Sequence, residues 1–240
     1  MSLVVRGLKV DRGDLNVLEG VDLEVAQGDF VAVTGPSGCG KSTLLNAVAG
    51  LIPISAGNIV AERAALGYVF QRPMLLPWRT ALENAAFGLE CRGVDPDQAQ
   101  RRSRSFLERV GLAAFLDFLP HELSEGMKQR VALARAFLVE PTLVLMDEPF
   151  SSLDEAARRE LQDLVLDLWR QSSCTVIFVS HFLDELAYLA DRVVVMGGRP
   201  AKVARSVEID LPRPRGAGND GMLALAKAVQ RCRQAAQEGK

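Results

Sequence analysis

The chain has 240 residues, of which 48% are hydrophobic and 24% are charged, values that exclude a disordered, collagen-like or coiled-coil protein. Its 28 Lys and Arg residues nearly balance its 30 Asp and Glu residues, giving a formal net charge of −2. This balance offers no support for a polyanion-binding surface, and we expect no nucleic-acid partner.

The cysteines and the N-terminal segment indicate the cellular compartment in which the chain is expected. The four cysteines lie far apart, with no CxxC pair, so we expect neither a metal site nor a disulfide scaffold. The N-terminus carries charges at Arg6 and Lys9 and has no signal-type apolar core. The uncharged stretch 42–61 contains Asn, Gly and Pro residues that interrupt any membrane-spanning helix. We therefore expect a cytoplasmic chain.

The first quarter of the chain predicts strands followed by a helix. Short strands are predicted over Leu3–Val10 and Val21–Val25, with Gly and Asp turns between them. A third apolar run, Phe30–Thr34, leads into a glycine-rich segment. The residues after Lys41 are predicted to be helical, with Gly50 as the helix stop.

The later part of the chain alternates between the same two structures. Leu143–Met146 and Thr175–Ser180 are apolar throughout, which is typical of strands buried on both faces, and Val193–Met196 predicts another strand. Between them, Glu155–Gln171 has leucines at helical spacing. Strands that alternate with helices predict an α/β fold with a mostly parallel sheet.

The middle of the chain has a different pattern, which predicts the domain organisation. From about residue 80 to 140 the sequence is helical and more charged, as expected of a helical subdomain inserted into the sheet domain. We predict a core over 1–79 and 141–205, a helical subdomain over 80–140, and a tail over 206–240. The tail contains the sequence LPRPR and a short predicted helix near Met222–Ala236.

One glycine-rich segment predicts nucleotide binding. It fits the pattern GxxxxGK[ST] and lies between a predicted strand and a predicted helix. Backbone N–H groups of such a loop surround a phosphate chain, and the positive end of the following helix points at it. Lys41 can reach the β- and γ-phosphates, and the Ser42 hydroxyl can ligate Mg²⁺. The predicted nucleotide-binding residues of this loop are Gly35, Pro36, Ser37, Gly38, Cys39, Gly40, Lys41, Ser42 and Thr43.

A second acidic segment is the expected partner of that loop. The strand Leu143–Met146 runs into Asp147 and Glu148. An apolar strand ending in Asp is how a P-loop protein supplies a second Mg²⁺ contact, so Asp147 is a predicted metal ligand. Glu148 can orient or deprotonate the attacking water. Two solvated acids at a strand end are the alternative, which the neighbouring P-loop disfavours.

Further motifs resemble those of ATP-binding cassette (ABC) proteins. The segment 123–130, LSEGMKQR, resembles the LSGGQ signature, with Ser124 a good helix N-cap. The segment 151–154, SSLD, resembles the D-loop. His181 and Gln71 match the family's switch histidine and Q-loop glutamine. These elements occur in the family's order over nearly the whole chain. The chain is therefore identified as a member of the ABC family.

The resemblance implies the fold and the partners of the site. It implies a P-loop NTPase (RecA-like) core with a small antiparallel β subdomain and an inserted α-helical subdomain. It implies ATP and Mg²⁺, held in a homodimer whose two copies face head to tail. Ser124 and Gly126 would contact the γ-phosphate of the other copy's ATP, and Asp154 would bridge the copies.

The resemblance also implies the catalytic roles. Glu148 would be the catalytic base, and His181 would stabilise the transition state. Gln71 would sense Mg²⁺ and the transport partner, and would join Ser42 and Asp147 as a metal ligand. Most of the catalysis would then be positioning and electrostatics around the transferred phosphoryl group.

Three positions depart from the family pattern. Met127 replaces the usual signature glutamine, as in some importers. Glu125 replaces the first signature glycine and brings a carboxylate near the expected γ-phosphate. Either it points to solvent at little cost, or it weakens dimer closure and slows hydrolysis. Arg12 occupies the place of the adenine-stacking aromatic ring; it either stacks on the base or is simply solvated.

The wording of two segments indicates the subfamily. The LLPW…EN stretch around Trp78 and the later LPRPR resemble importers of the nitrate, sulfonate and taurine group. In the family, the first stretch faces a groove where a cytoplasmic helix of the membrane subunit docks. The resemblance thus implies transmembrane permease subunits, a solute-binding protein reached through the complex, and a peripheral location on the cytoplasmic side of the inner or plasma membrane.

Several alternatives stay open. Within the same chemistry, the chain could serve an ABC exporter or a lipid-transport system. A non-transport ABC ATPase would be expected to carry a coiled-coil insertion or a second cassette, and the sequence has neither. A P-loop kinase of small molecules would not need the signature, Q-loop and switch histidine together. A degenerate, inactive cassette is a further alternative, and the transported solute is not encoded in this chain.

Overall fold

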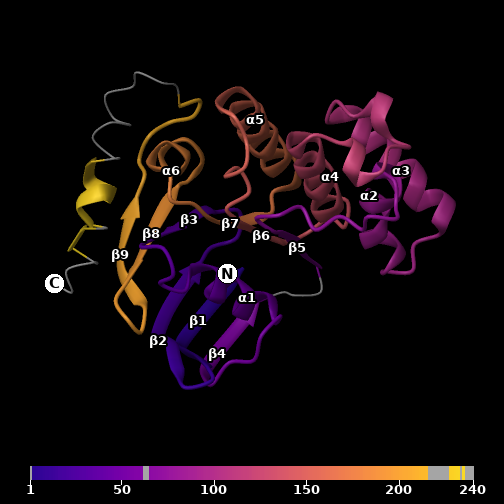
Figure 1. Cartoon of the computed structure of the whole chain (residues 1–240). Helices are drawn as coiled ribbons and strands as arrows, with labels where there is room; N and C mark the ends of the chain where they lie inside the picture. Colours follow the sequence, from indigo (N-terminus) through magenta and orange to yellow (C-terminus); the bar gives the residue numbers. More distant parts are fainter. Residues whose placement is uncertain (1, 62–64, 216–226, 233, 236–240) are drawn as a thin grey trace. The chain divides into compact units, whose positions relative to one another are not determined.

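The computed structural model describes residues 2–61, 65–215, 227–232 and 234–235. The chain divides into two compact units (Figure 1). The first consists of Met1–Arg63 and Thr175–Lys240, and the second is Ala64–Cys174. Within the described residues, no helix is long and apolar enough to cross a bilayer.

The first unit is built around a central buried strand, β3 (Phe30–Thr34). It pairs in parallel with β7 (Thr175–Val179) and with β8 (Arg192–Gly197), while β9 (Lys202–Glu208) adds to β8 in the antiparallel sense. Every residue of β3 and β7 is buried, as expected for apolar runs without alternation. Helix α6 (Leu183–Leu189) lies against β3 (Figure 1).

The same unit carries a small antiparallel sheet in the order β2-β1-β4. Strands β1 and β2 contain buried residues interspersed with exposed ones, so one face contributes to the core. This sheet corresponds to the predicted β subdomain. Its strands are β1 (Leu3–Arg12), β2 (Leu15–Val25) and β4 (Ala56–Ala61).

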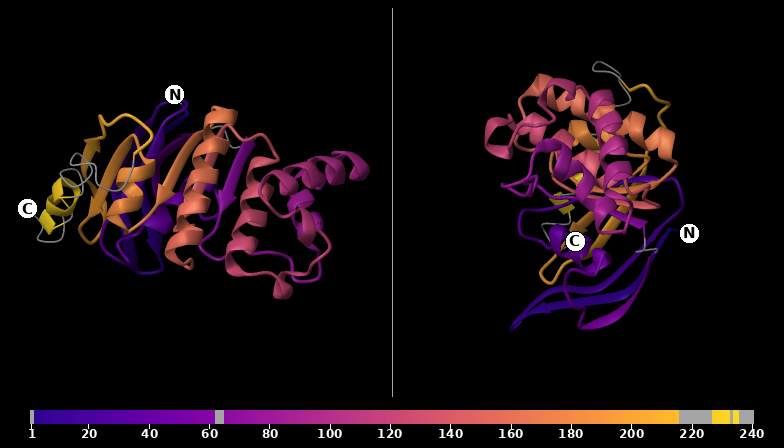
Figure 2. Two further views of the ribbon diagram at one scale, coloured as in Figure 1. Left: turned by 90° about the horizontal axis from the view of Figure 1, so that it is seen from above. Right: turned by 90° about the vertical axis from the view of Figure 1, so that its right-hand side faces the viewer.

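The second unit combines a parallel strand pair with helices. Strands β5 (Leu66–Val69) and β6 (Leu143–Asp147) pair in parallel. Helices α2, α3 and α4 pack against one another (Figure 2). They enclose a common apolar core that includes Ala85, Leu107 and Val131. The helices of this unit are α2 (Ala81–Glu90), α3 (Pro96–Arg109), α4 (Glu125–Phe137) and α5 (Glu155–Ser172), with short 3₁₀ turns at Ala113–Phe115 and Pro120–Glu122.

Most predicted elements are confirmed, with α1 (Lys41–Ala49) ending at Gly50 as expected. Strands β4, β5 and β9 and helix α6 were not predicted. Strands β4 and β9 are largely exposed and so lack an apolar pattern, and α6 is too short to show a helical period. Of the predicted tail helix, residues 227–232 and 234–235 are helical, and residues 222–226, 233 and 236 lie outside the described part.

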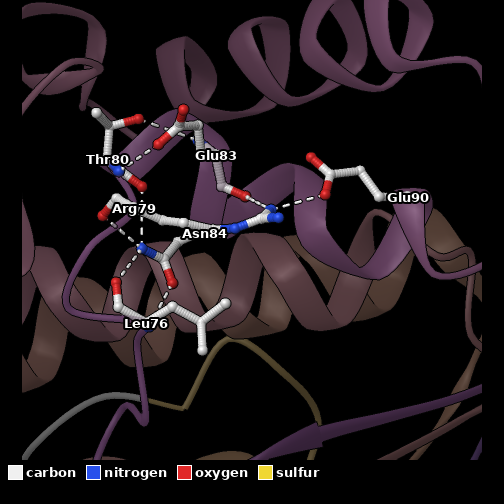
Figure 3. A network of polar contacts seen from close by, with 6 residues as sticks. All are labelled: Leu76, Arg79, Thr80, Glu83, Asn84 and Glu90. Atoms are coloured by element: carbon white, nitrogen blue, oxygen red, sulfur yellow. Dashed lines mark hydrogen bonds and ion pairs between the residues drawn. The ribbon is translucent and has the colours of Figure 1, made fainter.

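A buried asparagine fixes the entrance to α2 (Figure 3). The Asn84 amide donates to the carbonyls of Leu76 (3.1 Å), Arg79 (2.9 Å) and Thr80 (3.0 Å), and its oxygen accepts from the Leu76 N–H (2.7 Å). Thr80 and Glu83 form a capping box at the helix start. The loop before α2 is therefore tied to the helix by hydrogen bonds between the Asn84 side chain and backbone groups that are shielded from water.

We predict that Asn84→Ala lowers the free energy of unfolding by about 2–3 kcal/mol, because it leaves buried backbone groups unpaired. Denaturant unfolding measures the change, and hydrogen exchange should show lost protection at the Leu76 amide. The exposed Asn58 of β4 provides the control, since Asn58→Ala should change stability by less than about 0.5 kcal/mol. Equal effects of the two substitutions would contradict the assigned role of Asn84.

Candidate functional site

The predicted phosphate-binding loop lies between β3 and α1, in the first unit. Its lysine is drawn into the loop, because Lys41 Nζ donates to the carbonyls of Gly35 (3.0 Å) and Pro36 (2.9 Å). The Lys41 side chain is buried although it is cationic. The loop thus curves around a positive charge at the N-terminal end of a helix, a geometry suited to a phosphate chain.

Two glycines of this loop are required by close packing. A Cβ at Gly35 would collide with the carbonyl oxygen of Met196, a backbone atom. Gly40 has a φ of 109°, and a Cβ there would lie 2.8 Å from the Leu18 side chain. The loop therefore tolerates no side chain at these positions without a backbone shift.

Cys39 lies inside the same loop and is buried. Burial raises the pKa of the Cys39 thiol, and the nearby Lys41 charge offsets part of this increase. A raised pKa means that less thiolate is present at neutral pH, so the thiol is a weak nucleophile.

The predicted acidic pair lies at the end of β6, in the second unit. Glu148 has a left-handed backbone (φ 45°), which is uncommon for a residue other than glycine. Its carbonyl is held by Ser151, whose N–H and hydroxyl donate to it at 3.2 and 3.0 Å. Its carboxylate accepts a long hydrogen bond from Gln71 Nε2 (3.4 Å). The structure therefore brings Gln71 and Glu148 together, as a shared site requires.

Asp147 is half-buried beside Tyr68. Burial raises the pKa of the Tyr68 phenol, and the negative charge of Asp147 adds to this increase. The half-buried Asp147 carboxylate and the Tyr68 phenol are therefore close enough to interact electrostatically.

The signature-like segment begins helix α4. Ser124 is the N-cap, and its hydroxyl accepts from the Met127 N–H (3.3 Å), as predicted. Glu125 does not stand alone, because its carboxylate accepts from Lys128 Nζ at 2.7 Å. A Cβ at Gly126 would meet only Leu153, at 3.8 Å, so the helix start is open around that residue.

Side chains of α4 also hold the segment that follows β5. The buried Gln129 donates to the Gln71 carbonyl (3.2 Å). Arg135 donates to the carbonyls of Pro73 (2.8 Å) and Met74 (3.0 Å). Burial lowers the pKa of the Arg135 guanidinium. One helix thus connects the signature-like start to the predicted Q-loop.

The remaining predicted residues have these places. Asp154 caps α5, where its carboxylate accepts from the Ala157 N–H (2.9 Å). His181 is exposed in the first unit, and its ring lies 4.0 Å from that of Phe182. Arg12 is exposed at the end of β1, where it pairs with Leu15.

The predicted Mg²⁺ ligands fit the ion in their chemistry. Ser42 offers a hydroxyl, Asp147 a carboxylate and Gln71 an amide oxygen, which are hard oxygen donors of the kind Mg²⁺ prefers. Among the described residues, no three His, Cys, Asp or Glu side chains form a metal-binding group by themselves. When bound, Mg²⁺ would supply positive charge that offsets the charge of the phosphates.

Several residues that shape the site were not predicted from the sequence. Gln129, Arg135 and Asn84 act on backbone carbonyls, and such contacts leave no pattern in the sequence. Lys128 could have been found, because opposite charges three residues apart on a helix are a recognisable pair.

We predict that iodoacetamide alkylates Cys39 more slowly than the exposed Cys91 at pH 7.5, because the buried thiol with a raised pKa holds less thiolate. The Cys39 rate should rise as the pH approaches 9, and MgATP should slow it further. Mass spectrometry of the modified peptides gives both rates in one sample. A Cys39 rate equal to that of Cys91, or one that MgATP does not change, would contradict this picture of the loop.

Comparisons with known proteins identify the family of the chain. The family model described as ABC transporter matches residues 18–151. An aliphatic sulfonates import ATP-binding protein of Mycobacterium sp. is 45% identical over 227 residues, which cover 95% of this chain and 91% of that protein. A taurine import ATP-binding protein of Rhizobium johnstonii is 40% identical over 206 residues, covering 83% and 79% of the two chains.

A solved structure extends the comparison to the fold. A dimeric ATP-binding cassette in a post-hydrolysis state, bound to ADP and Pi, superimposes with a TM-score of 0.77 and 26% identity. The match covers 89% of this chain and 99% of that one. With the matched family model and these relatives, the chain belongs to the ABC transporter family, as one of its ATPase cassettes.

Proposed function

We propose that this chain is the ATP-hydrolysing subunit of an ABC importer of the sulfonate and taurine type, working as a homodimer on a membrane permease. The names of the sulfonate and taurine import relatives support this proposal. The observation that carries it is the reach of helix α4, which begins at Ser124 and holds the carbonyls of Gln71, Pro73 and Met74. Such a helix can relay nucleotide binding to a docking surface.

The proposed chemistry is hydrolysis of ATP with Mg²⁺. The loop from Gly35 to Thr43 binds the phosphates, and Arg12 lies against the base. Glu148 deprotonates or orients the attacking water, and His181 stabilises the charge of the transition state. Gln71, with Ser42 and Asp147, would hold Mg²⁺ and would sense both the ion and the transport partner. The left-handed backbone of Glu148 supports a functional role, because such strain collects at active sites.

Each ATP is shared between two copies in this proposal. Ser124 and Gly126 present the N-terminus of α4 to the γ-phosphate bound by the other copy, and Asp154 reaches across the interface. The carboxylate of Glu125 would repel that phosphate if it were uncompensated. The ion pair with Lys128 offsets this charge, which favours an active cassette over a degenerate one.

The proposed docking surface is the loop between Gln71 and α2. Trp78 and Met74 expose 72% and 63% of their surface, which is unusual for large apolar side chains. Asn84 and Arg135 fix the loop's backbone, so the two side chains are displayed on a rigid support. A cytoplasmic helix of the permease would bury them, and the chain would then be peripheral on the cytoplasmic side, with a solute-binding protein reached through the complex.

The proposal is tested by Glu148→Gln, which removes the base but keeps the shape of the side chain. We predict that this variant forms a stable dimer with MgATP but not with MgADP, because bound ATP is no longer hydrolysed. Light scattering after size exclusion measures the mass. The control is the double variant Glu148→Gln with Lys41→Ala, which should stay monomeric. A monomer under all conditions would contradict the shared site, and a small-molecule kinase would give that result.

We further predict that Lys128→Met weakens this ATP-dependent dimer by about tenfold, because the Glu125 carboxylate would then face the other copy's γ-phosphate without its counter-charge. Removing both charges, with Glu125→Gly and Lys128→Met together, should restore the dimer to within about twofold of the Glu148→Gln background. Sedimentation measures the dissociation constants. An unchanged constant for Lys128→Met alone would show that the Glu125 carboxylate lies away from the phosphate.

A further inference from the structure

The LPRPR segment has no part in the proposed function, yet it ends in the largest of the fully buried side chains. Arg215 is 2% exposed, and its Nε and Nη2 donate to the Leu211 carbonyl at 3.0 and 2.8 Å. Its Nη1 donates to the carbonyls of Ala187 (3.0 Å) and Ala190, at the C-terminal end of α6. The guanidinium therefore joins the tail to the end of that helix.

Arg213 strengthens the same junction. Its guanidinium donates to the Leu189 carbonyl and pairs with the Asp191 carboxylate. The last carbonyls of a helix otherwise lack partners, and cations near them are favourable. A seven-residue helix gains little stability by itself, so these contacts add to the packing of its buried side chains in holding α6 in place.

The other end of α6 is bonded to the residues around His181. The Ser180 hydroxyl donates to the buried carboxylate of Glu185, and it accepts from the Phe182 N–H at 3.1 Å. The Ser180 N–H donates to the Val33 carbonyl (3.2 Å), two residues before the phosphate-binding loop begins. The backbone on both sides of His181 is therefore fixed to α6 and to β3.

From this chain of contacts we propose that Arg215 is a positioning residue for His181. Arg215 holds the end of α6, α6 carries Glu185, and Glu185 orients the Ser180–Phe182 backbone from which the imidazole projects. The effect on catalysis rests on the proposed role of His181 in hydrolysis. The effect on the position of His181 does not depend on that role. The tail thereby contributes to the set of contacts that orients the His181 side chain.

Nuclear magnetic resonance of ¹³C-labelled histidine tests the structural part without any activity. The chain has two histidines, His121 in the second unit and His181 in the first, so His121→Gln assigns both signals. We expect Arg215→Met to shift or broaden the His181 signal and to leave the His121 signal unchanged. The exposed Arg205 on β9 gives the matched control, and Arg205→Met should leave both signals unchanged.

Two unchanged signals in folded Arg215→Met would overturn the proposal. If Arg215→Met does not fold, the milder Arg213→Met takes its place, because that side chain is partly exposed and bonds to the same helix end. With Arg213→Met as with Arg215→Met, a shift confined to His181 supports the tail's role and no shift refutes it.

Kinetics separate this inference from the proposed function. Arg215→Met should lower kcat at least about fivefold, with KM for ATP within about twofold, since positioning acts on the transition state. In a His181→Ala background the same substitution should change kcat by less than about twofold, because its target is gone. If His181→Ala itself keeps full kcat, the proposed role of His181 fails. If only His181→Ala lowers kcat, the role of Arg215 fails.

Discussion

Helix α4 is the element on which the second unit depends, through hydrogen bonds from its side chains to backbone carbonyls. Gln129 holds Gln71, and Arg135 holds Pro73 and Met74. A Cβ at Gly67 of β5 would lie only 2.6 Å from the Ala136 carbonyl, so helix and strand are in close contact. Because Ser124 caps this helix, the signature-like segment and the segment after β5 are joined through one rigid element.

Four described residues of the second unit other than glycine have left-handed backbones, and two of them, Glu140 and Ser173, have no assigned role. Glu148 and Met74 both have left-handed backbones, at φ 45° and 47°. Such conformations cost about 1–3 kcal/mol and persist only where the surroundings enforce them. Ser151 supplies that support at Glu148, and Arg135 supplies it at Met74. Hydrogen bonds from neighbouring side chains therefore hold both residues in their strained conformations.

Chemistry that needs a fixed residue type could be predicted from the sequence. The phosphate-binding loop, the acidic strand end and the Ser124 cap each have a local pattern with a physical cause. Contacts to backbone carbonyls could not be predicted, because every residue has a carbonyl that can accept a hydrogen bond. The type of the accepting residue therefore gives no pattern in the sequence. For this reason Asn84 and Arg215 had no assigned role before the structure, although both are buried and saturated with hydrogen bonds. Strand β9 and helix α6 were missed because exposure and shortness remove the apolar period.

The central claim is that this cassette serves a membrane permease. The most direct measurement is affinity purification of the tagged chain from detergent-solubilised membranes of its own cells, with mass spectrometry of the co-purifying proteins. The account predicts a stoichiometric polytopic membrane protein, lost when Met74 and Trp78 are both replaced by serine and kept when the exposed Leu15 is replaced instead. Only soluble or nucleic-acid-bound partners would contradict the account and favour a non-transport ABC ATPase.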